Sequence, residues 1–476
     1  MKQKVGQTIY DIGLLSLLAV IFIRGHGLWP GFEIAVRDIP SDHWAGFIIS
    51  LLGYGTVAVV AGLVARAIGR FSFLFYFNIL LFGLFFLEQI YIMLKIWRWV
   101  PESVFLWFVL VAITVWALIE NMKKPKSVRS SARRGFDPAV VIIFGWIVIA
   151  LMYYLPTNLS LTRTPYTDEG VLWYVQAADF INIPAAAREY TRCLSSQSYG
   201  IPFICALPNL LFAFKLNHNI FYMPIILIFQ TGLFLNYLRK DKWAFVFFSG
   251  ALLMTVMRHL WWRQLFLGLV YGEGIAAVFF MVIVYECWRL KEQARTIPLS
   301  TMGLLSFGIG LLAFTKAPTS LIFCAFFPFL VFQQVNPVHR VFLFLFMLCL
   351  PFLSWVLFSP DPTHYLGQIS ALDADRFGLM VAYLVKWYTS PIFFAGLSFI
   401  GIIFSFKKDE WLHLVPVLSQ FLFIVWGYLF VFSQREYESA GRYIMHGMLA
   451  LYFLGSVAFS RIVQRFMKRF DVSGLR

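Results

Sequence analysis

Long apolar segments alternate with short polar ones along most of this 476-residue chain. Most of the apolar segments come close to the length of about 17–25 residues that a helix needs to cross a bilayer. The pattern predicts an all-α, polytopic transmembrane helical bundle of about 14 spans. The expected spans are 10–25, 44–65, 71–94, 103–120, 139–156, 219–238, 243–257, 272–288, 300–315, 318–334, 341–358, 390–406, 411–432 and 443–460.

Two apolar stretches do not fit this pattern of simple spans. Residues 199–214 contain two prolines, which interrupt helical hydrogen bonding. Residues 376–388 are short and carry charges. For both stretches the sequence leaves two structures open, a helix lying at the membrane interface and a helix dipping partway into the bilayer.

The composition agrees with a membrane location. Hydrophobic residues make up 60% of the chain and charged residues 13%, whereas soluble domains have about 45–50% and about 25%. A soluble fold could not hide this much apolar surface, but lipid can face it directly. The first apolar segment lacks a small-residue cleavage site, so we interpret it as a retained span and not as a signal peptide.

The net charge of +15 comes from basic residues that cluster in the loops between the apolar segments. Basic residues concentrate in every second loop, which indicates that these loops and both termini are cytoplasmic. No basic region interleaved with aromatic residues is available for nucleic acid, so nucleic-acid binding is excluded. The polar, basic run near residue 123 marks the best module boundary. We therefore divide the chain into a four-span N-terminal module, a cytoplasmic linker, a ten-span core with an outer loop at 157–218, and a basic cytoplasmic tail, at 1–122, 123–138, 139–461 and 462–476.

An acidic pair, Asp168 and Glu169, follows the span that ends near residue 156, on the predicted outer side. Apolar and aromatic residues follow it at helical spacing. One interpretation is an acidic helix start, which the helix N-terminus stabilises. The other is a carboxylate that takes a proton from an acceptor or binds a cation.

Further ionisable residues lie at the same predicted membrane surface. Charged groups at a membrane boundary are costly unless they are paired, extend to the interface or have a function. Each of them alone is more typical of an interfacial anchor, but together they suit an anionic, lipid-linked substrate, because Arg and Lys bind phosphate oxygens. They are Arg258, Arg263, Glu273, Lys316 and Arg442, which is followed by Tyr443.

Four motifs in order over residues 139–460 resemble the GT-C membrane glycosyltransferases, which use polyprenyl-phosphate-linked sugars and include the protein mannosyltransferases and the aminoarabinose transferases of lipid A. The motifs are YTDEGVLWYVQAADF, YGIPFICALPNLLFAF, LLAFTKAPTSLIF and GRYIMHGMLALYF. The resemblance implies a catalytic acid at Asp168, with Glu169 as its neighbour. It also implies basic residues that hold the lipid phosphate, for which Arg258, Lys316 and Arg442 are the candidates.

The chain also departs from that family. The four leading spans have no counterpart in the minimal family core, and TKAPT replaces the more usual TKP order. We expect a glycosyltransferase in a bacterial inner membrane that moves a sugar from a polyprenyl-phosphate donor to an unidentified glycan, lipid or protein acceptor at the outer face. No cofactor is indicated, although an acidic pair could recruit a divalent metal. The alternatives are a multi-span transporter or lipid flippase, which a one-sided distribution of polar groups disfavours, and a non-catalytic scaffold.

Overall fold

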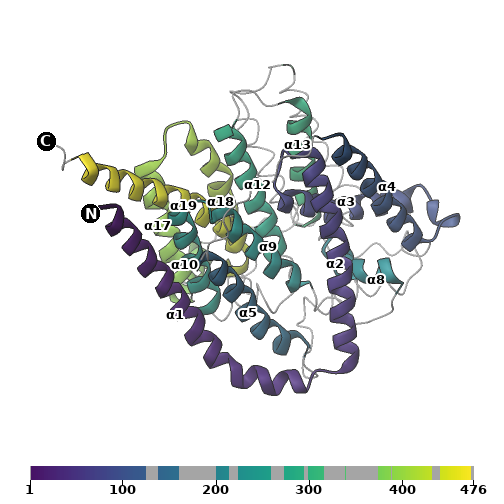
Figure 1. The fold of residues 1–476 in the computed structure, drawn as a ribbon, viewed down its shortest axis with the longest axis horizontal. Helices are drawn as coiled ribbons and strands as arrows, with labels where there is room; N and C mark the ends of the chain where they lie inside the picture. The colour runs from purple at the N-terminus through teal and green to yellow at the C-terminus, as the bar shows by residue number, and fades with distance from the viewer. Residues whose placement is uncertain are drawn as a thin grey trace.

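The computed structural model describes residues 2–124, 138–159, 200–213, 223–258, 273–293, 298–315, 338, 374–387, 389–430 and 440–472. Within these ranges every regular element is a helix, and no strand occurs (Figure 1). The α-helices are α1 (Lys2–Arg37), α2 (Ser41–Ile68), α3 (Phe73–Met93), α4 (Glu102–Lys123), α5 (Pro138–Leu159), α8 (Gly200–Phe212), α9 (Pro224–Leu238), α10 (Lys242–Arg258), α12 (Glu273–Gln293), α13 (Leu299–Leu311), α16 (Ala374–Trp387), α17 (Thr389–Ser405), α18 (Leu414–Phe430) and α19 (Ala440–Val472). Short 3₁₀ helices are η1 (Ile96–Arg98), η5 (Leu312–Phe314) and η6 (Glu410–His413).

Six of the described helices are long and apolar enough to cross a membrane, as expected of an integral membrane protein. A seventh span results if α16 and α17, which meet at a bend of 95°, count as one. The sequence predicted 14 spans, and that count stays a prediction. Several described helices, among them α9 and α13, have 15 and 13 residues, short of the about 20 that a 30 Å hydrocarbon core requires. The expected spans 318–334 and 341–358 lie outside the described residues.

The first helix is much longer than the predicted span at 10–25. It runs for 36 residues, Lys2–Arg37, with Pro30 inside it, and its apolar part is Thr8–Pro30. The last turn of the helix carries an ion pair of 2.6 Å between Arg37 and Glu33. Helical geometry therefore continues beyond the apolar pattern from which the span was predicted.

A tight turn joins α2 to α3. Helix α2 ends at Gly69, whose φ of 71° is left-handed and whose N–H donates to the Ala65 carbonyl at 2.8 Å. A residue without a Cβ adopts this conformation at no steric cost. Helix α3 starts three residues later, where the Ser72 hydroxyl accepts from the Phe75 N–H. The two helices pack against each other as a hairpin.

The four leading helices pack directly on the helices of the segment 139–461. Helix α1 lies along α5 and α10, α2 along α8, and α3 against α12 and α13 (Figure 1). Buried side chains from both segments form one hydrophobic core. Inside it, the amides of Asn78 on α3 and Gln230 on α9 bond reciprocally, at 3.0 and 3.2 Å. Paired amides of this kind hold helices together in an apolar interior.

Candidate functional site

Helix α19 packs between α10 and α12, and polar and aromatic contacts fix their directions. Ser460 of α19 donates to Asp241, just before α10, whereas Tyr452 lies 3.0 Å from Thr255 near the end of α10. Helix α10 therefore runs opposite to α19. The rings of Tyr285 and Phe453 are 5.6 Å apart, and further along both helices Arg461 pairs with Glu292 at 3.5 Å. Helices α12 and α19 therefore run in the same direction.

This arrangement brings together the backbone positions of several predicted site residues. Arg258 is the last residue of α10, Glu273 is the first of α12, and Arg442 and Tyr443 lie in the first turn of α19. All four belong to helix ends on the same side of the three-helix group. The described part of the structure does not include their side chains.

The other predicted site residues, Asp168, Glu169, Arg263 and Lys316, lie outside the described residues. Their neighbours in the sequence are informative. Gly200, which begins α8 and follows the loop that holds the acidic pair, lies so close to Phe314 that an added Cβ would meet the Phe314 Cβ at 2.8 Å. Phe314 comes two residues before Lys316. The start of α8 therefore lies against Phe314 of η5.

The electrostatics of the α10–α12–α19 end favour an anion. Helices α12 and α19 begin there and α10 ends there, so two helix N-termini, each with a partial positive charge of about half a unit, outweigh the similar negative charge of one C-terminus. Arg258 and Arg442 add two full positive charges, against the negative charge of Glu273. Such an arrangement can hold a phosphate group, because helix N-termini and guanidinium groups both bind phosphate oxygens.

Helix α8 is buried in the interior, although its 13 residues span only about 20 Å. Every residue from Gly200 to Leu211 is buried, and α8 packs on α2, α3 and α4. Pro208 has no N–H for the carbonyl of Ile204, one turn earlier, and the Tyr54 hydroxyl of α2 donates to that carbonyl at 3.0 Å. At the end of α8, the Trp107 indole N–H donates to the Leu211 carbonyl at 2.7 Å. The sequence left open whether residues 199–214 lie at the membrane interface or dip partway into the bilayer, and the burial of α8 inside the protein does not decide between these two structures.

Gly53 makes the approach of α8 to α2 possible. A Cβ at this position would meet the Cα and Cβ of Pro208 at 2.7 Å. Because one of these contacts is a backbone atom, a larger side chain has no space here. Gly53, Tyr54 and Pro208 therefore act together, and we call them the α8 lock.

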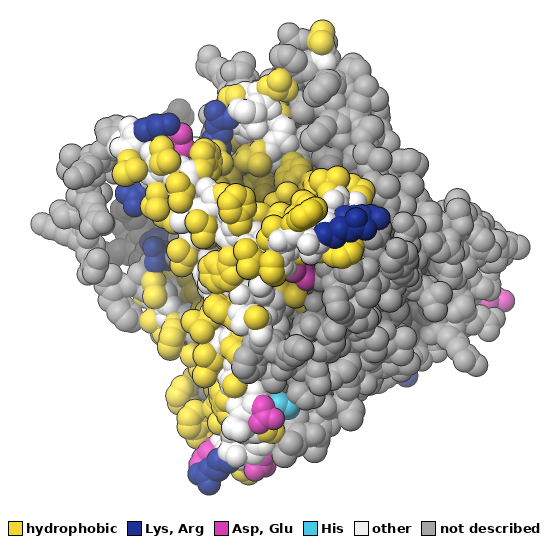
Figure 2. All heavy atoms as spheres, turned by 90° about the vertical axis from the view of Figure 1, so that its right-hand side faces the viewer, with side chains coloured by type: hydrophobic (Ala, Val, Ile, Leu, Met, Phe, Trp, Pro, Cys, Tyr) yellow, Lys and Arg dark blue, Asp and Glu magenta, His cyan; other side chains and the backbone are white. Residues whose placement is uncertain are grey.

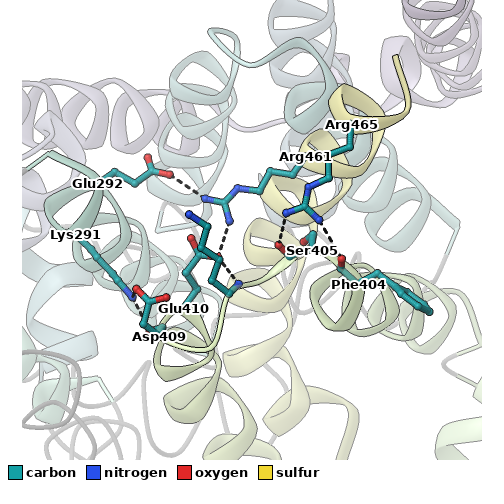
Figure 3. Close-up of polar contacts among 9 residues, drawn as sticks. Lys291, Glu292, Phe404, Ser405, Asp409, Glu410, Arg461 and Arg465 are labelled. Carbon is teal, nitrogen blue, oxygen red and sulfur yellow. Dashed lines mark hydrogen bonds and ion pairs between the residues drawn. The ribbon is translucent and has the colours of Figure 1, made fainter. Parts of the chain in front are cut away.

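An ionic network lies at the opposite ends of α12 and α19 (Figure 3). Arg461 of α19 contacts Glu410 at 2.7 Å and Glu292 at 3.5 Å, and Lys291 of α12 contacts Asp409 at 2.9 Å. The guanidinium of Arg461 also stands over the Trp288 ring, 5.0 Å from its centroid. Since Asp409 and Glu410 belong to the connection between α17 and α18, the network ties this connection to α12 and α19.

The network shifts the pKa values of the groups in that connection. The hydrogen bond from Lys291 lowers the pKa of Asp409 below its usual range. Burial tends to raise the pKa of Glu410, but hydrogen bonds from Arg461 and from the Lys407 N–H outweigh it, and the pKa is lowered. Burial lowers the pKa of His413 to about 3, so this imidazole is neutral at pH 7. The carboxylates are therefore ionised partners of the network at neutral pH.

A second group of contacts at the same ends centres on Glu286, which is fully buried. Its carboxylate pairs with Arg289 at 2.8 Å and accepts from the Ser72 N–H at 2.7 Å, at the start of α3. Arg289 also donates to the Arg70 carbonyl, and Arg70 donates to Thr301 of α13 at 2.9 Å. The α2–α3 turn, α12 and α13 are thereby joined.

The sequence did not indicate these contacts, and its pattern predicted that polar groups concentrate at the outer face. The described ion pairs outside α1 and α4 lie at the other ends of α12 and α19. Charged groups therefore lie at both ends of these helices, and their distribution does not disfavour a transporter. One signal was available, because a charge such as Glu286 inside the apolar run VIVYECW needs a partner.

Among the described side chains, no group of three or more His, Cys, Asp or Glu could hold a metal ion. Asp168 and Glu169 lie outside that part of the chain. No protein-family model matches this chain, and no curated protein or solved structure matches it either. The class that the fold defines is an integral membrane protein built from helices.

Proposed function

We propose that this protein is a glycosyltransferase that moves a sugar from a polyprenyl-phosphate donor to an acceptor at the outer face of a bacterial plasma membrane, with both termini in the cytoplasm. The observation that carries the proposal is the convergence of α10, α12 and α19. Their ends on one side bear Arg258, Glu273 and Arg442, three of the ionisable residues that we expect at the site of an anionic, lipid-linked substrate. The orientation of the chain, with both termini in the cytoplasm, rests on the excess of basic residues in every second loop.

In the proposed reaction, Asp168 takes the proton from an acceptor hydroxyl, and the acceptor oxygen forms a bond to the anomeric carbon of the sugar. The bond between that carbon and the phosphate oxygen breaks, and the lipid phosphate leaves with the electron pair. Arg258, Lys316 and Arg442 stabilise the negative charge that develops on the phosphate. Electrostatic stabilisation of this kind is usually a large part of catalysis.

A transporter or lipid flippase is the second candidate, and two observations favour it. Helix α8 is a short, proline-containing helix inside the protein, and Asn78 and Gln230 are polar residues buried in the core. Transporters often use interrupted helices and buried polar groups at their binding sites. A transporter would move a lipid between leaflets without forming a product.

Turnover separates the two candidates. Purified protein in nanodiscs is supplied with decaprenyl phosphates carrying different monosaccharides and with extracted membrane acceptors, and released decaprenyl phosphate is measured. We expect release for one donor and a loss of about 10²–10⁴-fold in Asp168→Asn, which keeps the shape but removes the base. Glu169→Gln is the matched control and should retain most activity.

Three outcomes would count against parts of the proposal. Activity in Asp168→Asn but not in Glu169→Gln would move the base by one residue. Full activity in both variants would exclude this loop as the catalytic one. No release with any donor, together with lipid transfer between leaflets in proteoliposomes, would support the flippase.

A further inference from the structure

A groove of about 580 Å³ lies between the first half of α4 and the end of α8. The lining is apolar except for one hydroxyl, and the volume is typical of sites for small ligands. The lining residues are Ser103, Val104, Trp107, Phe108, Val111, Leu211, Phe212 and Ala213. The hydrogen bond from the Trp107 indole to the Leu211 carbonyl holds the wall of the groove in place.

The groove opens where a membrane helix presents its lipid side. The side chains of Val104, Phe108 and Val111 are 53%, 71% and 53% exposed, although α4 is one of the helices apolar enough to cross a membrane. Figure 2 looks onto this side of the molecule, and hydrophobic side chains make up much of its described surface. An apolar groove that is continuous with a lipid-facing surface suits a hydrocarbon chain.

The connection from α3 to α4 supplies the complementary charge. It carries Lys95 and Arg98, together with Trp97 and Trp99, and leads directly into α4. Arg98 lies over the Trp97 ring, 5.4 Å from its centroid, and Trp99 is 87% exposed. Tryptophans are enriched at the membrane–water interface, and cations there attract anionic headgroups.

This connection is also held in a fixed position next to the groove. The Tyr91 hydroxyl at the end of α3 donates to the Val100 carbonyl at 2.6 Å, and the Tyr91 ring stacks on Phe105 of α4 at 4.7 Å. Glu102 at the start of α4 offsets one of the two cations. The net charge of this corner stays positive.

We infer that the groove between α4 and α8 binds one chain of an anionic membrane phospholipid, whose headgroup lies against the connection of residues 94–101. The position of the groove favours a phospholipid over the sugar donor. Helix α4 packs on α2 and α8, whereas Arg258, Glu273 and Arg442 belong to α10, α12 and α19, of which α19 packs on the other two (Figure 1). The inference does not depend on the proposed function.

The test uses the full-length protein in nanodiscs with equal amounts of dioleoyl phosphatidylglycerol and dioleoyl phosphatidylcholine, followed by release and native mass spectrometry of the retained lipid. We expect the wild-type protein to retain phosphatidylglycerol. Val111→Trp should fill the groove and reduce retention by about tenfold or more, as expected when about two buried methylene groups are displaced. Val115→Trp is the matched control, because Val115 is 50% exposed one turn further along α4 and does not line the groove.

Arg98→Gln tests the headgroup separately. It should lower the preference for phosphatidylglycerol by about fivefold while total retention persists, because one interfacial cation is lost. If Val111→Trp does not fold, Ser103→Phe fills the other end of the groove and gives the same test. Equal retention in the Val111 and Val115 variants would overturn the inference. Displacement of phosphatidylglycerol by a small fraction of decaprenyl phosphate would overturn the assignment to a phospholipid. It would show that the groove binds the lipid chain of the donor.

Discussion

The α8 lock and the ionic network hold the same protein together by different chemistry. In the lock, neutral groups meet in a fully buried region: a glycine, a tyrosine hydroxyl and a carbonyl freed by proline. In the network, full charges meet at helix ends where side chains such as Lys291 and Arg461 stay 22% and 26% exposed. The difference follows from the cost of burial, since an unpaired charge costs far more in an apolar interior than a neutral group does. Substitutions that change side-chain volume should therefore destabilise the α8 lock, whereas changes in pH and salt concentration should affect the ionic network.

The largest effect is expected from Gly53→Leu. Its Cβ would meet Pro208 at 2.7 Å, with a backbone atom among the contacts, so α2 and α8 would have to separate. Overpacking of this kind costs about 1–3 kcal/mol and sometimes more. Thermal unfolding in detergent should show a much lower midpoint. The matched control is Gly55→Leu two residues away, where an added Cβ meets nothing within 4 Å. Equal destabilisation of both variants would show that α8 does not pack on Gly53.

Arg461→Met should have the next largest effect. It removes the main cation of Glu410, which is 9% exposed and keeps the Lys407 N–H as a donor, and a hydrogen bond to a charged group contributes about 1.5–3 kcal/mol. Arg37→Met is the control, because Arg37 pairs with Glu33 at an exposed position where an ion pair contributes little. A loss of stability in Arg37→Met as large as in Arg461→Met would contradict the assignment.

The network should also give the unfolding midpoint a dependence on pH. The folded protein lowers the pKa values of Asp409 and Glu410, so these groups contribute stability above the ordinary carboxyl pKa of about 4. That contribution is lost as the pH falls through the lowered values. In Arg461→Met the part of this loss that involves Glu410 should shrink, whereas in Gly53→Leu it should persist. If the dependence of the midpoint on pH is unchanged in Arg461→Met, Arg461 does not lower the pKa of Glu410, and the assignment of Glu410 to the network is wrong.

The smallest effect is expected from Tyr54→Phe, which removes one hydrogen bond to the Ile204 carbonyl, at a cost of about 0.5–1.5 kcal/mol. The role of the proline in this cost can be tested with Pro208→Ala, because alanine supplies an N–H that can donate to the same carbonyl. The cost of Tyr54→Phe should therefore fall in the Pro208→Ala background. An equal cost in both backgrounds would show that the tyrosine does not compensate for the proline.

The apolar pattern of the sequence predicted the helices better than their roles. All but two of the 14 expected spans coincide with described helices, and those two lie outside the described residues. The burial of α8 could not be derived, because YGIPFICALPNLLFAF is equally apolar whether it meets lipid or protein. Only its contact with Gly53 and Tyr54, about 150 residues earlier, decides between them.

The ionic network was beyond sequence reasoning for a related reason. Lys291 and Asp409 are 118 residues apart, and Arg461 and Glu292 are 169 apart. In the sequence each is simply a charge in or beside a polar loop. Pairing depends on how α12, the α17–α18 connection and α19 pack, and the pattern of a single chain does not contain that information. The grouping of the proposed donor residues could not be predicted from the sequence for the same reason, since they come from three separate helices.

One measurement tests the central claim, that the donor phosphate binds where α10 ends and α12 and α19 begin. A decaprenyl phosphate with a photoreactive group on the isoprene unit next to the phosphate is crosslinked to the protein in nanodiscs, and labelled peptides are identified by mass spectrometry. Decaprenol, which has the chain without the phosphate, is the control. We predict phosphate-dependent labelling in peptides that contain Arg258, Glu273 or Arg442. Labelling confined to the ionic network around Glu410 and Arg461, or equal labelling by decaprenol, would contradict the account.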